Sequence, residues 1–183
     1  MKKNKSSCTE ILFAGFGGQG IMFLGKMMAQ AGLDAGKHVT WMPSYGAEVR
    51  GGTAYSMAKI SDEEIASPIV NHLDILVAMN KPSMIKYEPK LKAKGMLIMN
   101  RSLIDEKPKR KDIEVISIPM TEIASKIGDT RCANMVAAGA MIKKTKLVSI
   151  KTAGQALKEM LKGKEDLLAF NKKALEKGYK IAK

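Results

Sequence analysis

The chain has 183 residues, the length of one domain, and its composition of 45% hydrophobic and 27% charged residues is that of an ordinary globular protein. Its two cysteines and two histidines are too few for a disulfide framework, a four-thiolate zinc site or an iron–sulfur cluster. The net charge of +13 raises the question of whether the chain binds nucleic acids.

The positive charge is uneven and consists almost entirely of lysine. Residues 81–111 carry ten basic side chains against three acidic ones, and residues 143–183 carry twelve against four, whereas residues 6–80 are net negative. Only four of the 31 basic residues are arginine, and aromatic residues are 5% of the chain. Because proteins that bind nucleic acids rely on arginine forks and aromatic stacking, we expect solvated helix faces or docking of an acidic partner, and no nucleic acid.

The sequence predicts no association with a membrane. No apolar stretch reaches the roughly 20 residues that span a bilayer. Glycines interrupt the apolar residues that follow the N-terminal lysines, which argues against a signal peptide. A cytoplasmic protein is therefore expected.

The first half of the chain alternates between strand and helix patterns. Residues 9–14 form a short apolar run, and residues 20–34 carry apolar side chains at helical spacing. Strands are predicted at residues 38–42 and 53–60, with a further strand considered at 65–70. Since no helix separates these last two segments, we expect an antiparallel element.

The second half continues the alternation and ends in helices. A lysine-rich helical segment is expected at residues 83–94, broken by Pro89. The further predicted strands are residues 74–79, 96–99 and 113–118, and the predicted helices are residues 121–127, 134–144, 151–161 and 165–182.

This alternation predicts an α/β fold: a three-layer sandwich on a mostly parallel, mixed sheet, with a Rossmann-like start and C-terminal helices. Residues 1–183 are expected to form a single domain. Its α/β core would span residues 6–120, and a mainly helical remainder, residues 121–183, would pack on that core.

A glycine loop lies at the first strand-to-helix junction, where residues 15–20 (GFGGQG) match G-x-G-x-x-G. Backbone amides and the helix N-terminus there could hold an anion, although the glycines could also simply allow tight packing. An NAD site is disfavoured because no acidic residue ends the second strand, and no Gly-Lys-Ser/Thr follows for a P-loop. The candidate binding residues of this loop are Gly15, Gly17, Gly18, Gln19 and Gly20.

A second glycine-rich loop, residues 43–53 (PSYGAEVRGGT), follows the second predicted strand. Ligands of α/β sheets bind at such strand ends, although Glu48 and Arg50 could instead form an ion pair that braces the loop. The candidate binding residues here are Ser44, Tyr45, Gly46, Glu48, Arg50, Gly51 and Gly52. Asn80 and Asn100 each follow another predicted strand, where they would either face a ligand or cap a turn.

Together the two loops resemble the γ subunit of 2-oxoacid:ferredoxin (acceptor) oxidoreductases. The similarity continues through DILVAMN with Pro82, residues 96–100, and ANMVA at residues 133–137, so it covers essentially the whole chain. One departure is Ala47, where the family usually has proline. Indolepyruvate oxidoreductases carry a related subunit.

The resemblance implies a complex that oxidatively decarboxylates a 2-oxoacid to an acyl-CoA and passes electrons to ferredoxin. Such a complex uses thiamine diphosphate, magnesium, 4Fe–4S clusters and coenzyme A, with α, β and δ-type subunits as partners. The two loops would bind coenzyme A phosphates or shape the subunit interface. This sequence has no thiamine motif, because Gly128-Asp129-Thr130 breaks the Gly-Asp-Gly pattern. The isolated chain, which could form a homodimer, should therefore be catalytically inactive and bind no cofactor alone.

Two other functions stay open at this point: a free-standing Rossmann-type nucleotide-binding oxidoreductase and a basic module that binds RNA or DNA.

Among single residues, Asn134 is expected to cap the helix that it begins. Cys132 is expected to be a small, semi-buried residue, in preference to a thiol that Arg131 activates.

Overall fold

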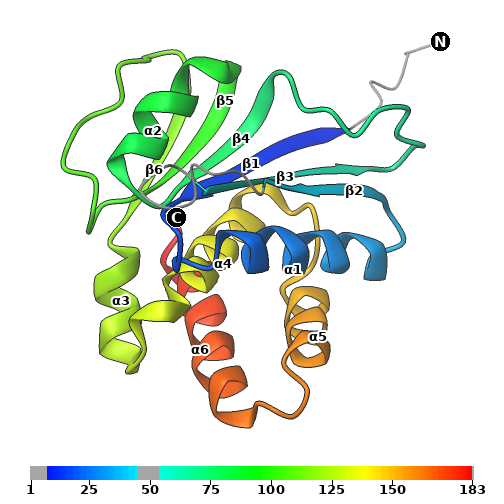
Figure 1. Ribbon diagram of the computed structural model, residues 1–183, viewed down its shortest axis with the longest axis vertical. Coiled ribbons are helices and arrows are strands. Elements are labelled where there is room, and N and C mark those ends of the chain that lie inside the picture. The colour runs from blue at the N-terminus through cyan, green and yellow to red at the C-terminus, as the bar shows by residue number, and fades with distance from the viewer. Residues whose placement is uncertain (1–7, 45–53, 183) are drawn as a thin grey trace.

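The computed structural model describes residues 8–44 and 54–182, and this part of the chain contains one six-stranded sheet with helices on both faces (Figure 1). The strands are β1 (Thr9–Gly15), β2 (His38–Pro43), β3 (Ala54–Ser61), β4 (Leu73–Ala78), β5 (Leu91–Asn100) and β6 (Glu114–Ile118). The α-helices are α1 (Ile21–Asp34), α2 (Lys81–Tyr87), α3 (Met120–Ile127), α4 (Ala133–Thr145), α5 (Ile150–Met160) and α6 (Glu165–Ile181). Two short 3-10 helices are η2 (Glu88–Lys90) and η3 (Thr130–Cys132).

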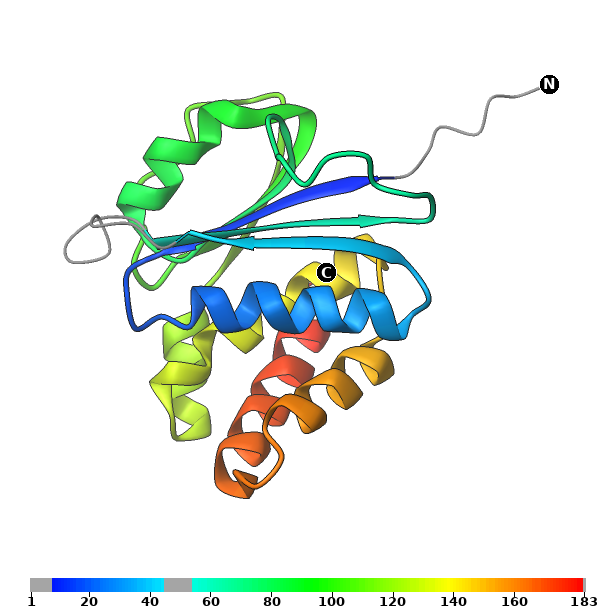
Figure 2. The ribbon, with the colours of Figure 1, turned by 45° about the vertical axis from the view of Figure 1, so that its right-hand side comes forward.

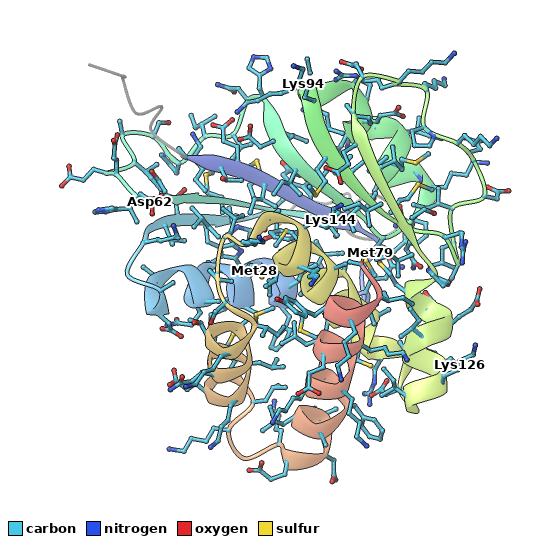
Figure 3. All side chains as sticks on the ribbon, turned by 180° about the vertical axis from the view of Figure 1, so that it is seen from behind. Met28, Asp62, Met79, Lys94, Lys126 and Lys144 are labelled. Carbon is cyan, nitrogen blue, oxygen red and sulfur yellow. The ribbon has the colours of Figure 1, made fainter. Side chains whose placement is uncertain are left out.

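The sheet is mixed, with the strand order β2-β3-β1-β4-β5-β6. The pairs β1–β4, β4–β5 and β5–β6 are parallel, whereas β3 is antiparallel to both β1 and β2 and separates these two strands. As a result β1, β2, β4, β5 and β6 all end at the same edge, which we call the carboxyl edge. Figure 3 labels Met79 at this edge and Lys94 at the opposite one.

Helices cover the two faces of the sheet unequally. In Figure 2, α2 lies above the sheet, while α1 and the C-terminal helices lie below it. β1 serves both apolar cores: Ile11 and Phe13 belong to the core with α1 and α4, and Leu12 and Ala14 to the core with α2. Because β1 is buried on both faces, its sequence is a nearly continuous apolar run.

α4 and α6 pack with their backbones in close contact. Every residue of α4 from Ala133 to Ile142 is buried. A Cβ atom added at Gly139 would lie 2.0 Å from the carbonyl oxygen of Leu175, and one at Gly178 would lie 2.0 Å from that of Val136. Only glycine fits at these two positions, one on each helix.

The structure confirms the α/β fold class and the mostly parallel mixed sheet. An antiparallel element is also present, but it is β3 paired with β1 and β2 and not a pair of strands at residues 53–60 and 65–70. The helical segment that Pro89 breaks is also confirmed: α2 ends at Tyr87 and passes through η2 into β5. The strand considered at residues 65–70 is wrong, since these residues pair with no described strand. Ser67, Pro68 and Ile69 are consecutive exposed residues, so the segment lacks the alternation of buried and exposed side chains that a strand on a sheet would show.

None of the helices in residues 8–44 and 54–182 combines the length and the apolar composition that a membrane span requires.

Candidate functional site

The glycine loop connects β1 to α1 at the carboxyl edge. Gly15 ends β1, Gly17 and Gly18 form an exposed turn, and α1 begins after Gly20. Gly18 (φ +90°) and Gly20 (φ +69°) both adopt left-handed backbone conformations that favour glycine. None of the described side chains caps α1, and its first-turn amides and the positive end of the helix dipole are directed at this edge.

The side chain of Gln19 holds the glycine loop in place through hydrogen bonds. Its Oε1 accepts hydrogen bonds from the backbone N–H of Phe16 (2.7 Å) and from Asn80 Nδ2 (3.3 Å), and its Nε2 donates to the carbonyl of Met79 (3.4 Å). A Cβ atom on Gly15 would lie 2.6 Å from this Oε1. Gly15 thus allows Gln19 to pack closely against the end of β1, whereas Gly17 and Gly18 are exposed to solvent.

Two buried asparagines fix the ends of β4 and β5. Asn80 Oδ1 accepts from the N–H of Ser83 (2.9 Å) and caps α2. Asn100 Oδ1 accepts from the N–H of Met120 (3.0 Å), and its Nδ2 donates to Thr121 Oγ1 (2.9 Å). The turn-capping interpretation of both residues is therefore confirmed, and their polar groups are engaged within the protein.

The prediction that Asn134 caps its helix is wrong. η3, whose N-terminus is capped by the Asp129 side chain, leads directly into α4, so the helix begins at Ala133, before Asn134. Asn134 Nδ2 instead donates to the carbonyl of Gly20 (3.1 Å) and links α4 to the glycine loop. Its Oδ1 is buried and has no hydrogen-bond partner among the described residues.

A small pocket of about 210 Å³ opens beside the glycine loop. It is lined by Gly18, Gln19, Met79, Leu103, Thr121, Thr130, Arg131 and Ala133. Three of these residues, Thr121, Thr130 and Arg131, could not be predicted as site residues from the sequence, because they lie far along the chain from the glycine loop and no spacing pattern links them to it.

Arg131 places a cation at this pocket. Its side chain is 74% exposed, and its guanidinium forms an ion pair with Asp129 (Nη2 to Oδ2, 2.8 Å). Hydrogen bonding from Arg131 lowers the pKa of the Asp129 carboxyl, so the pair stays charged. A guanidinium, two hydroxyls and helix-start amides form a set that suits an anion such as a phosphate.

The second candidate loop is described only at its first residue. Ser44 follows β2, and its N–H donates to the carbonyl of Tyr55 (3.0 Å) on β3. Ser44 and Ala54, the first residue of β3, both lie at the carboxyl edge, so the segment between them starts and ends there. The candidates outside the described residues are Tyr45, Gly46, Glu48, Arg50, Gly51 and Gly52, together with the Glu48–Arg50 ion pair.

Cys132 is a buried thiol. It is 1% exposed, and burial raises its pKa to about 11. The expectation of a small buried residue is thus confirmed, and activation by Arg131 is wrong because that guanidinium pairs with Asp129 instead. In the described residues, no three His, Cys, Asp or Glu side chains gather as a metal site would require.

We predict that the two cysteines differ sharply in reactivity. Cys8 is partly exposed, whereas Cys132 is buried with a raised pKa, and the thiolate is the reactive form. At pH 8 iodoacetamide should modify Cys8 in the native chain and leave Cys132 intact, as peptide mass spectrometry would measure. Equal labelling of both thiols without denaturant would contradict the burial of Cys132.

Comparison with known proteins identifies the family. The family described as pyruvate ferredoxin/flavodoxin oxidoreductase matches residues 10–181. The chain belongs to this family. It is 39% identical over 156 residues to the 2-oxoglutarate synthase subunit KorC of Methanothermobacter marburgensis, covering 81% of this chain and 84% of that subunit. The chain spans only about a third of the length of other curated relatives, the ketoisovalerate oxidoreductase subunits VorA of Methanothermobacter.

Solved structures of family members have the same fold. The γ subunit of a keto/oxoacid ferredoxin oxidoreductase from Geobacter sulfurreducens superposes with a TM-score of 0.83 and 32% identity, covering 95% of this chain and 98% of that one. A 2-oxoglutarate:ferredoxin oxidoreductase from Magnetococcus marinus, with 2-oxoglutarate, coenzyme A and succinyl-CoA bound, gives a TM-score of 0.87 and 29% identity over 97% of this chain and 31% of that chain. The resemblance to γ subunits of this family is therefore confirmed.

Proposed function

We propose that this chain is the γ-type subunit of a complex that oxidises a 2-oxoacid to an acyl-CoA and passes the electrons to ferredoxin. The observation that carries the proposal is the family match along nearly the whole chain, combined with the fold shared with a separate γ subunit. We infer that residues 1–183 act as a single unit in the cytoplasm and that the isolated chain can form a homodimer.

In this proposal the redox centres lie on other subunits. Four cysteine thiolates hold a 4Fe–4S cluster, and the chain has two cysteines in all. Thiamine diphosphate with its magnesium, and the clusters, would therefore be held by α, β and δ-type partners, which also present the surface for ferredoxin. The isolated chain is expected to be inactive.

The contribution of this chain would be to hold coenzyme A by its phosphate groups at the carboxyl edge. Backbone N–H groups of Gly17 and Gly18 and the start of α1 would face a phosphate, and Arg131 would pair with it from the pocket beside the loop. Asp129 holds the guanidinium of Arg131 in place, so little side-chain freedom is lost on binding. Coenzyme A bound in a family member of the same fold supports this assignment.

The second loop would complete the coenzyme A site or the subunit interface around it. Ser44 and Ala54 anchor the two ends of this loop at the carboxyl edge. As the sequence predicts, Arg50 would pair with a phosphate or with a partner's carboxylate, while Tyr45 and Glu48 would fix the loop. Gln19 and Asn80 would keep the glycine loop in its binding conformation.

Purification under native conditions tests the proposal. The tagged chain, expressed together with the genes that flank its own, should co-purify with one chain that carries a Gly-Asp-Gly thiamine motif and one that carries four-cysteine cluster motifs. The purified assembly should reduce ferredoxin only with both a 2-oxoacid and coenzyme A present. A chain that purifies alone and binds NAD(H) tightly in calorimetry would instead be a free-standing nucleotide-binding oxidoreductase.

A further inference from the structure

A groove is lined by residues of α5 and α6 and of the turn that joins them. Figures 1 and 2 show these two helices side by side below the sheet, beyond α1 and α4. The groove has a volume of about 820 Å³ and follows both helices for most of their length. Ile150 and Leu168 are partly exposed along it, and the buried Leu175 also lines it. The groove therefore offers an apolar floor to a ligand or a partner.

Gly154 lines this groove, and its missing side chain leaves space there. It lies in the middle of α5, where glycine costs about 1 kcal/mol relative to alanine. Gly139 and Gly178 are also inside helices, but a Cβ atom there would collide with backbone, whereas a Cβ atom at Gly154 would meet no atom within 4 Å. Packing within the described chain thus does not require glycine at this position, and the missing side chain leaves room for another backbone to approach α5 closely.

The rim of the groove is basic. Four exposed lysines line it against two glutamates, Glu159 and Glu176. The four are Lys151, Lys158, Lys162 and Lys172. Within the described residues none of them forms an ion pair with a carboxylate, in contrast to Lys81 and Lys92 on the other side of the molecule. The lysines on the rim therefore outnumber the glutamates four to two, and the rim is net positive.

We propose that this groove docks an acidic amphipathic helix of another protein. A helix laid along α5 and α6 would place apolar side chains on Ile150, Leu168 and Leu175, and its backbone would approach Gly154. Its carboxylates would face the four lysines. The eleven residues of α5 span about 16 Å, which accommodates roughly three turns of a partner helix. The groove lies away from the carboxyl edge, so this inference does not depend on the proposed function.

The test uses a defined probe and the full chain. A fluorescein-labelled peptide of sixteen residues, helical, with leucine on one face and glutamate on the other, is titrated with the chain, and fluorescence anisotropy is recorded. A scrambled peptide of the same composition lacks the apolar stripe. The expected result is saturable binding of the amphipathic peptide that exceeds binding of the scrambled one by roughly tenfold or more.

Two groove variants and one control locate the binding. Gly154→Leu fills the groove and raises helix propensity, so the chain should stay folded with an unchanged or higher melting temperature while binding weakens by roughly tenfold or more. Lys158→Glu combined with Lys172→Glu should weaken binding by a similar factor. Lys26→Glu combined with Lys111→Glu, which changes the charge equally at exposed sites elsewhere, should change it by less than roughly threefold.

Three results would overturn the proposal. They are the absence of saturable binding, equal binding of both peptides, and binding that Gly154→Leu leaves unchanged. A DNA duplex or phosphatidylglycerol vesicles that bind the chain, lose this binding in Gly154→Leu and exclude the peptide would assign the groove to a polyanion or a membrane surface instead.

Discussion

Gly178→Ala should lower the free energy of unfolding by about 3 kcal/mol, because it forces apart two helices whose backbones touch. The new Cβ atom would lie 2.0 Å from the carbonyl oxygen of Val136 and 2.8 Å from its carbonyl carbon. α4 cannot withdraw, since Ala133 to Ile142 are all buried. For a domain of this size the melting temperature should fall by roughly 6–12 °C, measurable by circular dichroism.

Gly154→Ala is the matched control for this variant. It makes the same change inside a helix, but into open space, and should raise the free energy of unfolding by about 0.5–1 kcal/mol. The two variants should therefore change the free energy of unfolding in opposite directions. Equal effects of the two substitutions, or no loss at Gly178, would mean that α4 and α6 are not in backbone contact.

Arg131→Gln, in the assembled complex, should raise the KM for coenzyme A by roughly 10- to 100-fold, because it removes a charge-assisted hydrogen bond to a phosphate. The KM for the 2-oxoacid should stay the same if, as proposed, the thiamine site lies on another subunit. The fold should also be retained, because the Arg131 side chain is largely exposed and an ion pair at such a position adds little to stability.

Lys111→Gln controls for the loss of one positive charge. Lys111 is exposed and precedes β6, so it lies at the edge of the sheet opposite the pocket. It should leave both KM values unchanged. If the KM for coenzyme A is the same in Arg131→Gln as in the wild type, or if both KM values rise together, Arg131 is not the phosphate ligand.

The sequence predicted the strands that are buried on both faces and was least accurate where a strand is polar. The apolar runs that became β1 and β4 could be recognised directly. β5 begins at Leu91, whereas the predicted strand begins at residue 96. The prediction missed the first residues because Lys92 and Lys94 interrupt the apolar pattern. Lys92 is held there by an ion pair with Asp74 on β4 (2.8 Å), a contact that becomes apparent only once the two strands are paired.

The candidate site could be predicted only where its residues are close together in the sequence. The G-x-G-x-x-G pattern located the turn between β1 and α1, including two glycines with positive φ. Asn134 contacts Gly20 across 114 residues, and Arg131 lines the pocket beside the glycine loop from η3. Local propensity assigned Asn134 to a helix cap instead, since contacts of this kind depend on how α4 packs and leave no spacing pattern in the chain.

In the proposed function this chain is a required, non-redox subunit of a 2-oxoacid:ferredoxin oxidoreductase. The most direct test is to purify the partner subunits without this chain and to measure coenzyme A-dependent reduction of ferredoxin before and after adding it. We expect no such activity without the chain, restoration of activity when the chain is added, and no activity of the chain alone. Partner subunits that are fully active without it, or that stay inactive after it has bound to them, would contradict this role.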